Sequence, residues 1–113
     1  MPPIEELLTK ELDRLTARQE ALQQELDSLP RGYVSKKEIK GRDYFYLQHR
    51  EGQNVKSQLI KQGMLESILE KQQRKKQLKQ ELRENIREQK QVLRLLKKEQ
   101  RRKLFLGMKE KTI

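Results

Sequence analysis

The sequence contains no cysteine and no tryptophan, and its only other aromatic residues are three tyrosines and two phenylalanines among 113 residues. Without cysteine, the chain has neither a disulfide framework nor a thiolate metal site. Only 33% of the residues are hydrophobic and 39% are charged, which excludes a large globular core. Leucine, glutamate, glutamine, lysine and arginine dominate both ends of the chain, and this composition favours a coiled-coil protein.

Long apolar runs are also missing. No stretch approaches the ~20 apolar residues that a membrane span needs. The N-terminus lacks the basic and then apolar pattern of a secretory signal. We therefore expect a protein of the cytoplasm that makes no membrane contact.

The residues that carry catalysis are sparse. His49 is the single histidine, and the carboxylates are scattered along the chain. A metal site needs several strong ligands at fixed spacing, and a nucleophile relay needs a base and an orienting acid beside it. We expect no enzyme activity, no cofactor and no metal, and we predict His49 to be a strand residue near a hairpin turn.

Charge is distributed unevenly along the chain. Residues 1–30 hold three bases and seven acids, residues 31–61 hold eight and three, and residues 62–113 hold sixteen and seven. The formal net charge is +10. A surplus of this sign suits a polyanion or an acidic protein surface better than a small substrate. The alternative is a solvated helix surface whose charge only keeps the protein soluble.

The first segment, residues 1–29, predicts a helix with an apolar seam. Its seam positions are Leu8, Leu12, Leu15, Leu22 and Leu26. Gln19 is a polar residue in the same heptad pattern. The seam should pair either with the last segment or with another copy of the chain. Because eight polar residues interrupt the apolar pattern at 70–77, we favour a homodimer.

The middle segment, residues 33–61, predicts a meander of three short antiparallel strands. Tyrosine, phenylalanine and β-branched residues alternate with turn residues. Phe45 and Leu47 share one face of the second strand, whereas Tyr44 and Tyr46 share the other. The last segment, residues 64–106, predicts a long basic helix. The expected fold is a single α+β domain over 1–113, with two coiled-coil-like helices flanking the sheet.

The candidate binding residues are clustered bases and the two tyrosines beside them. Lysine and arginine density of this kind binds phosphates, and aromatics beside cations on a small sheet can stack nucleobases. In the middle segment the candidates are Lys36, Lys37, Lys40, Arg42, Tyr44 and Tyr46. In the last segment they are Arg74, Lys75, Lys76, Lys79, Arg83, Lys97, Lys98, Arg101 and Arg102. The tyrosines could also belong to the core.

Two motifs carry a resemblance to a known group. They are Leu-Pro-x-Gly-Tyr at 29–33 and Lys-Gly-x-x-Tyr-x-Tyr-Leu at 40–47. With the long charged helix, the chain resembles small proteins of phages and integrative elements of Gram-positive bacteria. The resemblance implies a mobile-element protein and supplies no catalytic residues. Because such elements encode inhibitors of host defence, it makes an anti-CRISPR protein a candidate.

The sequence thus favours a non-enzymatic protein that binds RNA, DNA or a ribonucleoprotein through its basic helix and sheet. One alternative is an anti-CRISPR inhibitor that binds a Cas9-type nuclease or its guide RNA. A second alternative is a structural coiled-coil oligomer.

Overall fold

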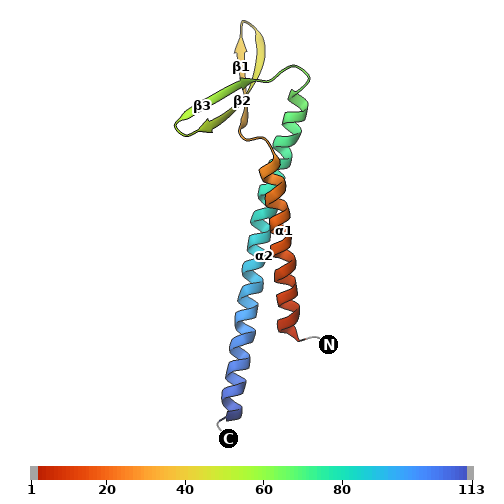
Figure 1. The fold of residues 1–113 in the computed structure, drawn as a ribbon, viewed down its shortest axis with the longest axis vertical. Helices are drawn as coiled ribbons and strands as arrows, with labels where there is room; N and C mark the ends of the chain where they lie inside the picture. Colours follow the sequence, from red (N-terminus) through yellow and green to blue (C-terminus); the bar gives the residue numbers. More distant parts are fainter. Residues whose placement is uncertain (1–2, 112–113) are drawn as a thin grey trace. The chain divides into compact units, whose positions relative to one another are not determined.

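The computed structural model describes residues 3–111. The elements are helix α1 (Ile4–Ser28), strands β1 (Tyr33–Ile39), β2 (Arg42–Glu51) and β3 (Asn54–Leu59), and helix α2 (Leu65–Lys111), as Figure 1 shows. This α+β arrangement confirms the predicted fold class. Met1 and Pro2 of the predicted first segment lie outside the described residues.

Local sequence signals account for the bounds of the helices. Glu5 and Glu6 occupy the first turn of α1, where negative charge offsets the positive end of the helix dipole. Pro30 follows shortly after α1 and cannot continue it. Gly63 has a φ of 95° and lies two residues before α2, so the chain turns there without the steric cost that a side chain would add. With 47 residues, α2 is about 70 Å long at 1.5 Å per residue.

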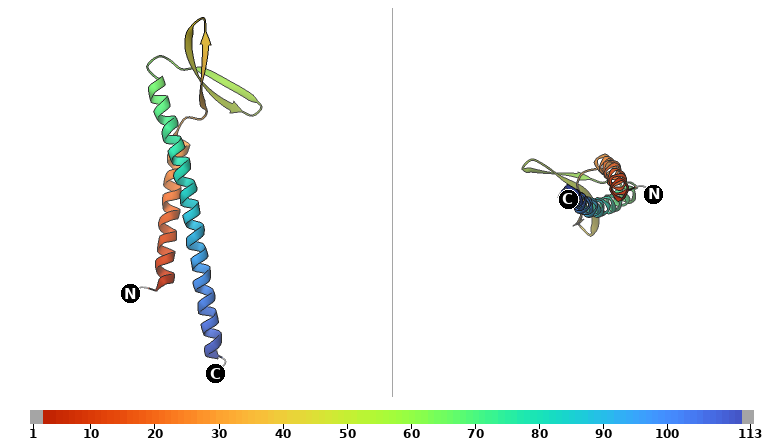
Figure 2. Two further views of the ribbon diagram at one scale, coloured as in Figure 1. Left: turned by 180° about the vertical axis from the view of Figure 1, so that it is seen from behind. Right: turned by 90° about the horizontal axis from the view of Figure 1, so that it is seen from below.

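The chain forms two compact units. The first combines the chain up to Gln24 with the chain from Gln80 onward. In this helical unit α1 and α2 lie side by side and antiparallel, as Figures 1 and 2 show. Lys103 near the end of α2 pairs with Glu5 at the start of α1, which fixes the direction of the pairing.

The core of the helical unit shows which of the two expected pairings the chain itself makes. Leu15, Val92 and Leu96 form a buried cluster, and Leu8 and Leu12 pack against it. The seam of α1 therefore packs against α2 of the same chain, and the homodimer stays a prediction. Leu22 is also buried and Leu26 is half-buried. The pattern that is interrupted at 70–77 resumes further along α2, where it supplies the partner.

Polar side chains complete the seam of the helical unit. Asn85 is 6% exposed, and its side-chain amide donates a hydrogen bond to the carbonyl oxygen of Leu15 at 3.0 Å. The amide of Gln89 donates to the side-chain oxygen of Gln19 at 2.8 Å. Gln19, the polar residue in the heptad pattern, thus has a polar partner on the other helix.

The second unit, Glu25–Lys79, contains the antiparallel sheet in the order β1-β2-β3. Tyr33 to Ile39 pair with Gln48 to Arg42, and Asn54 to Leu59 pair with Glu51 to Tyr46. Only residues 46–48 of β2 pair on both sides. The two hairpins diverge from these shared residues, which is visible in Figures 1 and 2.

The turn between α1 and β1 is held tightly in the sheet unit. Gly32 has a φ of 108°, and a Cβ there would lie 2.3 Å from the carbonyl oxygen of Gln48. The amide of Gln72 donates to the carbonyl oxygen of Gly32 at 3.0 Å. Arg74 donates two hydrogen bonds to the carboxylate of Glu25, at 2.7 and 2.9 Å. These contacts fix Arg31 and Tyr33 on either side of the glycine.

Candidate nucleic-acid interface

The two faces of the sheet differ in charge. Residues directly opposite in an antiparallel ladder share a face, and alternate residues along a strand share a face. The register therefore places all three tyrosines, Tyr33, Tyr44 and Tyr46, on one face. The same face carries three cations and no carboxylate: Lys37, Arg42 and Arg50. We call this surface the tyrosine face.

All three acids of the strands lie on the opposite face, and two of them are paired with bases there. Lys36 lies 3.4 Å from Asp43, and Lys56 lies 2.8 Å from Glu51. The pKa of Glu51 lies below its ordinary value because Lys56 and then His49 hydrogen-bond its carboxylate. Lys36, a predicted binding residue, is thus separated from the tyrosines.

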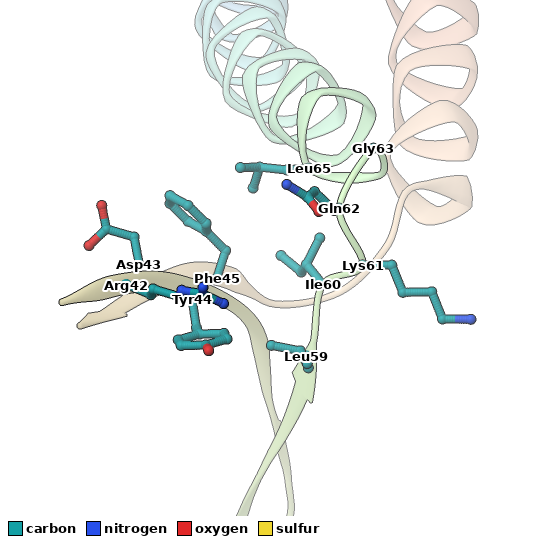
Figure 3. Close-up of a pocket in the computed structure, with 10 residues that line it drawn as sticks. All are labelled: Arg42, Asp43, Tyr44, Phe45, Leu59, Ile60, Lys61, Gln62, Gly63 and Leu65. Atoms are coloured by element: carbon teal, nitrogen blue, oxygen red, sulfur yellow. The ribbon is translucent and has the colours of Figure 1, made fainter. Parts of the chain in front are cut away.

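The predicted alternation of side chains on β2 agrees with the structure. Figure 3 shows Phe45 directed toward Leu65 of α2 and Tyr44 directed to the other side of the sheet. Tyr44 and Tyr46 are half-buried, and the ammonium of Lys37 lies 5.0 Å from the centre of the Tyr46 ring. A cation over an aromatic face is an attractive contact. Tyr33 is the most open of the three, with 57% of its surface exposed.

The pocket drawn in Figure 3 lies in the sheet unit. It measures about 460 Å³ and lies between β2, the end of β3 and the start of α2. Its lining is largely apolar, with Phe45, Leu59, Ile60 and Leu65 among its residues. Asp43 is the single acid of the lining, and it pairs with Lys36.

A second cationic surface lies on α2 in the helical unit. Six bases recur there at alternating intervals of four and three residues, which places them along one side of a helix. They are Arg83, Arg87, Lys90, Arg94, Lys97 and Arg101, and all are exposed. We call this row the α2 stripe. It spans about 27 Å at 1.5 Å per residue.

Neither the buried residues nor the acids of this part of α2 lie in the stripe. Leu82, Asn85, Val92 and Leu96 are buried and mark the side that packs on α1. At 100° per residue, the stripe lies almost opposite that side. The acids between residues 81 and 99 also fall outside the stripe: Glu81, Glu84, Glu88 and Glu99. Two of them pair with bases outside the stripe, Glu81 with Arg18 at 3.8 Å and Glu99 with Arg102 at 2.7 Å.

The structure divides the predicted basic residues by environment. Arg74 and Arg102 are engaged by Glu25 and Glu99, and Lys40 has a φ of 52° in the turn between β1 and β2. Lys75 is half-buried, and its pKa is lowered by burial and then by the like charges of Lys79 and Arg31. Lys76, Lys79 and Lys98 are exposed.

Several bases of these surfaces are absent from the sequence-based predictions. Arg87, Lys90 and Arg94 complete the α2 stripe. Each is isolated in the sequence, whereas the predictions were based on clusters of neighbouring bases. Their spacing at four and three residues is the signal that identifies them. Tyr33 and Arg50 of the tyrosine face are also absent from those predictions, because the strand register that places them on one face is a feature of the fold.

Other kinds of site are not seen in the part of the chain that the structure describes. Residues 3–111 contain no group of three or more histidine, cysteine or acidic side chains placed to hold a metal ion. His49 lies in β2, and its Nε2 is 3.2 Å from the carboxylate of Glu51. Neither described helix is long and apolar enough to cross a membrane.

The comparison with known families places this chain in one of them. Residues 4–70 match the family described as a domain of unknown function, DUF6788, and the protein belongs to this family. The matched range includes α1, the whole sheet and the start of α2, whereas the α2 stripe lies beyond it. No curated protein and no solved structure matches the chain.

Proposed function

We propose that this protein is a non-enzymatic nucleic-acid-binding protein of the cytoplasm whose helical contact surface is the α2 stripe. The observation that carries the proposal is the segregation of charge around α2. Six exposed bases lie in one row, and the acids of the same stretch lie outside it. A solvated helix needs no such segregation, because bases and acids three or four residues apart stabilise each other when they are mixed.

The spacing of the stripe suits a phosphate backbone. Bases on consecutive turns lie about 4.5–6 Å apart along the helix axis, so several phosphates of one strand can be contacted together. Each phosphate that a lysine or arginine neutralises releases condensed counterions, and this makes the affinity strongly dependent on salt. Phosphate contacts alone carry little sequence information. We therefore expect the stripe to bind without marked sequence preference.

The experiment is a salt titration of binding with two matched variants, measured by fluorescence anisotropy of a labelled twenty-base-pair DNA duplex. The first variant is R87Q/K90Q/R94Q, which removes three stripe bases. The control is K10Q/R14Q/R18Q, which removes three exposed bases of α1. Each of these α1 bases has an acid partner: Glu6, Glu11 and Glu81. Glutamine is a good helix former, so both variants should keep the fold.

The stripe variant should bind more weakly, and its slope of log affinity against log salt should be less negative by about 2 to 3. The control carries the same change in net charge and should retain most of the wild-type slope. Equal loss in both variants would mean that the net charge acts without a defined surface. No binding by the wild type at about 50 mM salt, where electrostatic binding is strong, would contradict the proposal.

Inhibition of a CRISPR nuclease is a narrower form of the same proposal. Such an inhibitor would bind guide RNA or nucleic acid exposed on the effector, and its charge would speed the encounter. The test adds the protein to a Cas9-type nuclease before and after guide loading and measures target cleavage. Tight binding to free nucleic acid with unchanged cleavage would contradict the inhibitor and would support the general binding function. The structural-oligomer alternative is weakened, because the α1 seam packs within the chain.

A further inference from the structure

A pocket of the sheet unit is lined by an exposed tyrosine and two arginines. It measures about 430 Å³ and is lined by Arg31, Gly32, Tyr33, His49, Arg50 and Val55. Tyr33 is 57% exposed and Val55 is 55% exposed. The lining contains no carboxylate. Its volume lies within the range of about 300–1,000 Å³ that is usual for small-ligand sites.

The fold positions the cations of this pocket. Arg31 precedes Gly32, whose backbone lies against Gln48 so closely that no side chain would fit. Gln72 holds the Gly32 carbonyl from α2, and the Arg74–Glu25 pair joins α2 to the end of α1 just before the turn. Arg50 lies opposite Val55 in the β2–β3 ladder. Two separate segments thus each place an arginine at the same pocket.

The positive charge continues beyond the pocket along α2. Lys75 is half-buried and interacts with the like charges of Lys79 and Arg31. Like charges three or four residues apart destabilise a helix, so this grouping has a cost in the free protein. An anionic ligand that binds there would offset that cost. The surface therefore suits a chain of phosphates better than one isolated phosphate.

We infer that this pocket binds one nucleotide of a single-stranded nucleic acid, with the base stacked on Tyr33 and the phosphates contacting Arg31 and Arg50. This inference rests on the proposed nucleic-acid-binding function and adds the class of ligand. A base in a duplex is already stacked on both sides, whereas a base in a single strand is free to stack on an aromatic side chain. The strand would continue past Arg31 toward Lys75 and Lys79, and over the tyrosine face toward Tyr46.

The test uses three labelled probes of twelve nucleotides and the full chain. One probe is oligothymidylate, which cannot pair with itself. The second is an abasic strand with the same phosphates and no bases. The third is a duplex. The variants are Tyr33→Ala, Tyr33→Phe, and Arg31→Gln with Arg50→Gln. The control is Lys36→Gln with Lys56→Gln on the opposite face of the sheet, and circular dichroism checks the fold of each variant.

Tyr33→Ala should weaken binding of oligothymidylate by at least about fivefold, because stacking on one aromatic side chain contributes that much or more per base. Its affinity for the abasic strand should stay unchanged, and Tyr33→Phe should bind like the wild type. The double arginine variant should lose affinity for both single strands. The control variant should lose less affinity for the two single strands than the double arginine variant does. Wild-type protein should prefer oligothymidylate to the duplex.

Two results would overturn the inference while leaving the proposed function intact. One is binding of all three probes with no effect of Tyr33→Ala. The other is equal loss of affinity for oligothymidylate and for the abasic strand in Tyr33→Ala, which would mean that the ring does not contact a base. Absence of binding to any of the three probes would overturn the inference and the proposed function together.

Discussion

The side-chain amide of Asn85 donates a hydrogen bond to the backbone carbonyl oxygen of Leu15, 3.0 Å away on the neighbouring helix. Asn85 is buried between Leu82 and Val92, which are themselves buried. A polar residue in a helix seam specifies register and partner at some cost in stability. The contact therefore explains why α1 pairs with α2 in one alignment.

This hydrogen bond predicts different effects on stability for two substitutions of Asn85. Asn85→Ala should lower the free energy of unfolding by about 1–2 kcal/mol, because a buried hydrogen bond is lost and Gln89 loses a partner. Asn85→Leu should not lower it, because an apolar side chain of similar size fills the seam. Asn85→Leu should instead loosen the choice of partner and produce dimers. Chemical denaturation and light scattering measure the two effects. Monomeric Asn85→Leu with reduced stability would contradict this account.

A second prediction concerns the turn before the sheet. Gly32→Ala should lower the free energy of unfolding by at least about 2 kcal/mol, because its positive φ strains an L-residue and the added Cβ would meet the Gln48 carbonyl at 2.3 Å. Gly41→Ala is the matched control. Its φ of 76° is also positive, but nothing lies within 4 Å of its Cβ. Equal losses in the two variants would show that the close contact with Gln48 is unimportant.

A third prediction concerns Lys75. Lys75→Met should raise the free energy of unfolding near neutral pH by about 0.5 kcal/mol, because it removes a like-charge interaction with Lys79 and keeps an apolar side chain on the helix. It should also weaken polyanion binding. The pKa of Lys75 in the folded protein lies below the ordinary value of 10.5. The increase in the free energy of unfolding of Lys75→Met should thus be complete below the pKa that Lys75 has in the folded protein. It should disappear as the pH rises to 10.5.

The exposed neighbour Lys76 provides the control for this prediction. Lys76→Met makes the same change in net charge one position further along α2. Lys76 also lies three residues from Lys79, but it is exposed, so the gain in stability should be smaller than in Lys75→Met. A fall in stability in Lys75→Met, measured by denaturation at several pH values, would mean that the Lys75 ammonium has a stabilising partner in the folded protein.

A fourth prediction concerns the acidic limb of the stability curve. The pKa of Glu51 is lowered in the folded protein by hydrogen bonds from Lys56 and His49, so its carboxylate contributes stability above its ordinary pKa of 4.5. That contribution is lost as the pH falls below this value through the folded pKa. Near neutral pH the wild type should have a higher melting temperature than Glu51→Gln, and the two melting temperatures should converge in acid. A constant difference in melting temperature across this range would contradict the assignment.

The sequence predicted much of the fold because the local signals are strong. The turn residues around Gly32 and Gly63 and the heptad leucines define the order of the elements to within a few residues of their observed bounds. The alternation of Tyr44, Phe45, Tyr46 and Leu47 predicted which side chains share a face, and the register agrees.

The pairing of the helices could not be predicted in the same way. The partner region of α2 contains Asn85 and Gln89 at seam positions, and polar residues there resemble a break in the pattern. Their hydrogen bonds to Leu15 and Gln19 satisfy them only when both helices are in place. Likewise, Arg74 resembles a free base in the sequence, and its partner Glu25 is 49 residues away.

The most direct measurement of the central claim is a nuclear magnetic resonance titration of the full chain with oligothymidylate. The account predicts that the perturbed signals cluster at the α2 stripe, around Arg87, Lys90 and Arg94, and at the pocket of Tyr33 and Arg50. Signals around Lys10, whose charge is paired with Glu6, should stay unchanged. Perturbations spread evenly over all bases, or confined to residues outside both surfaces, would contradict the claim that this protein binds nucleic acid through these two sites.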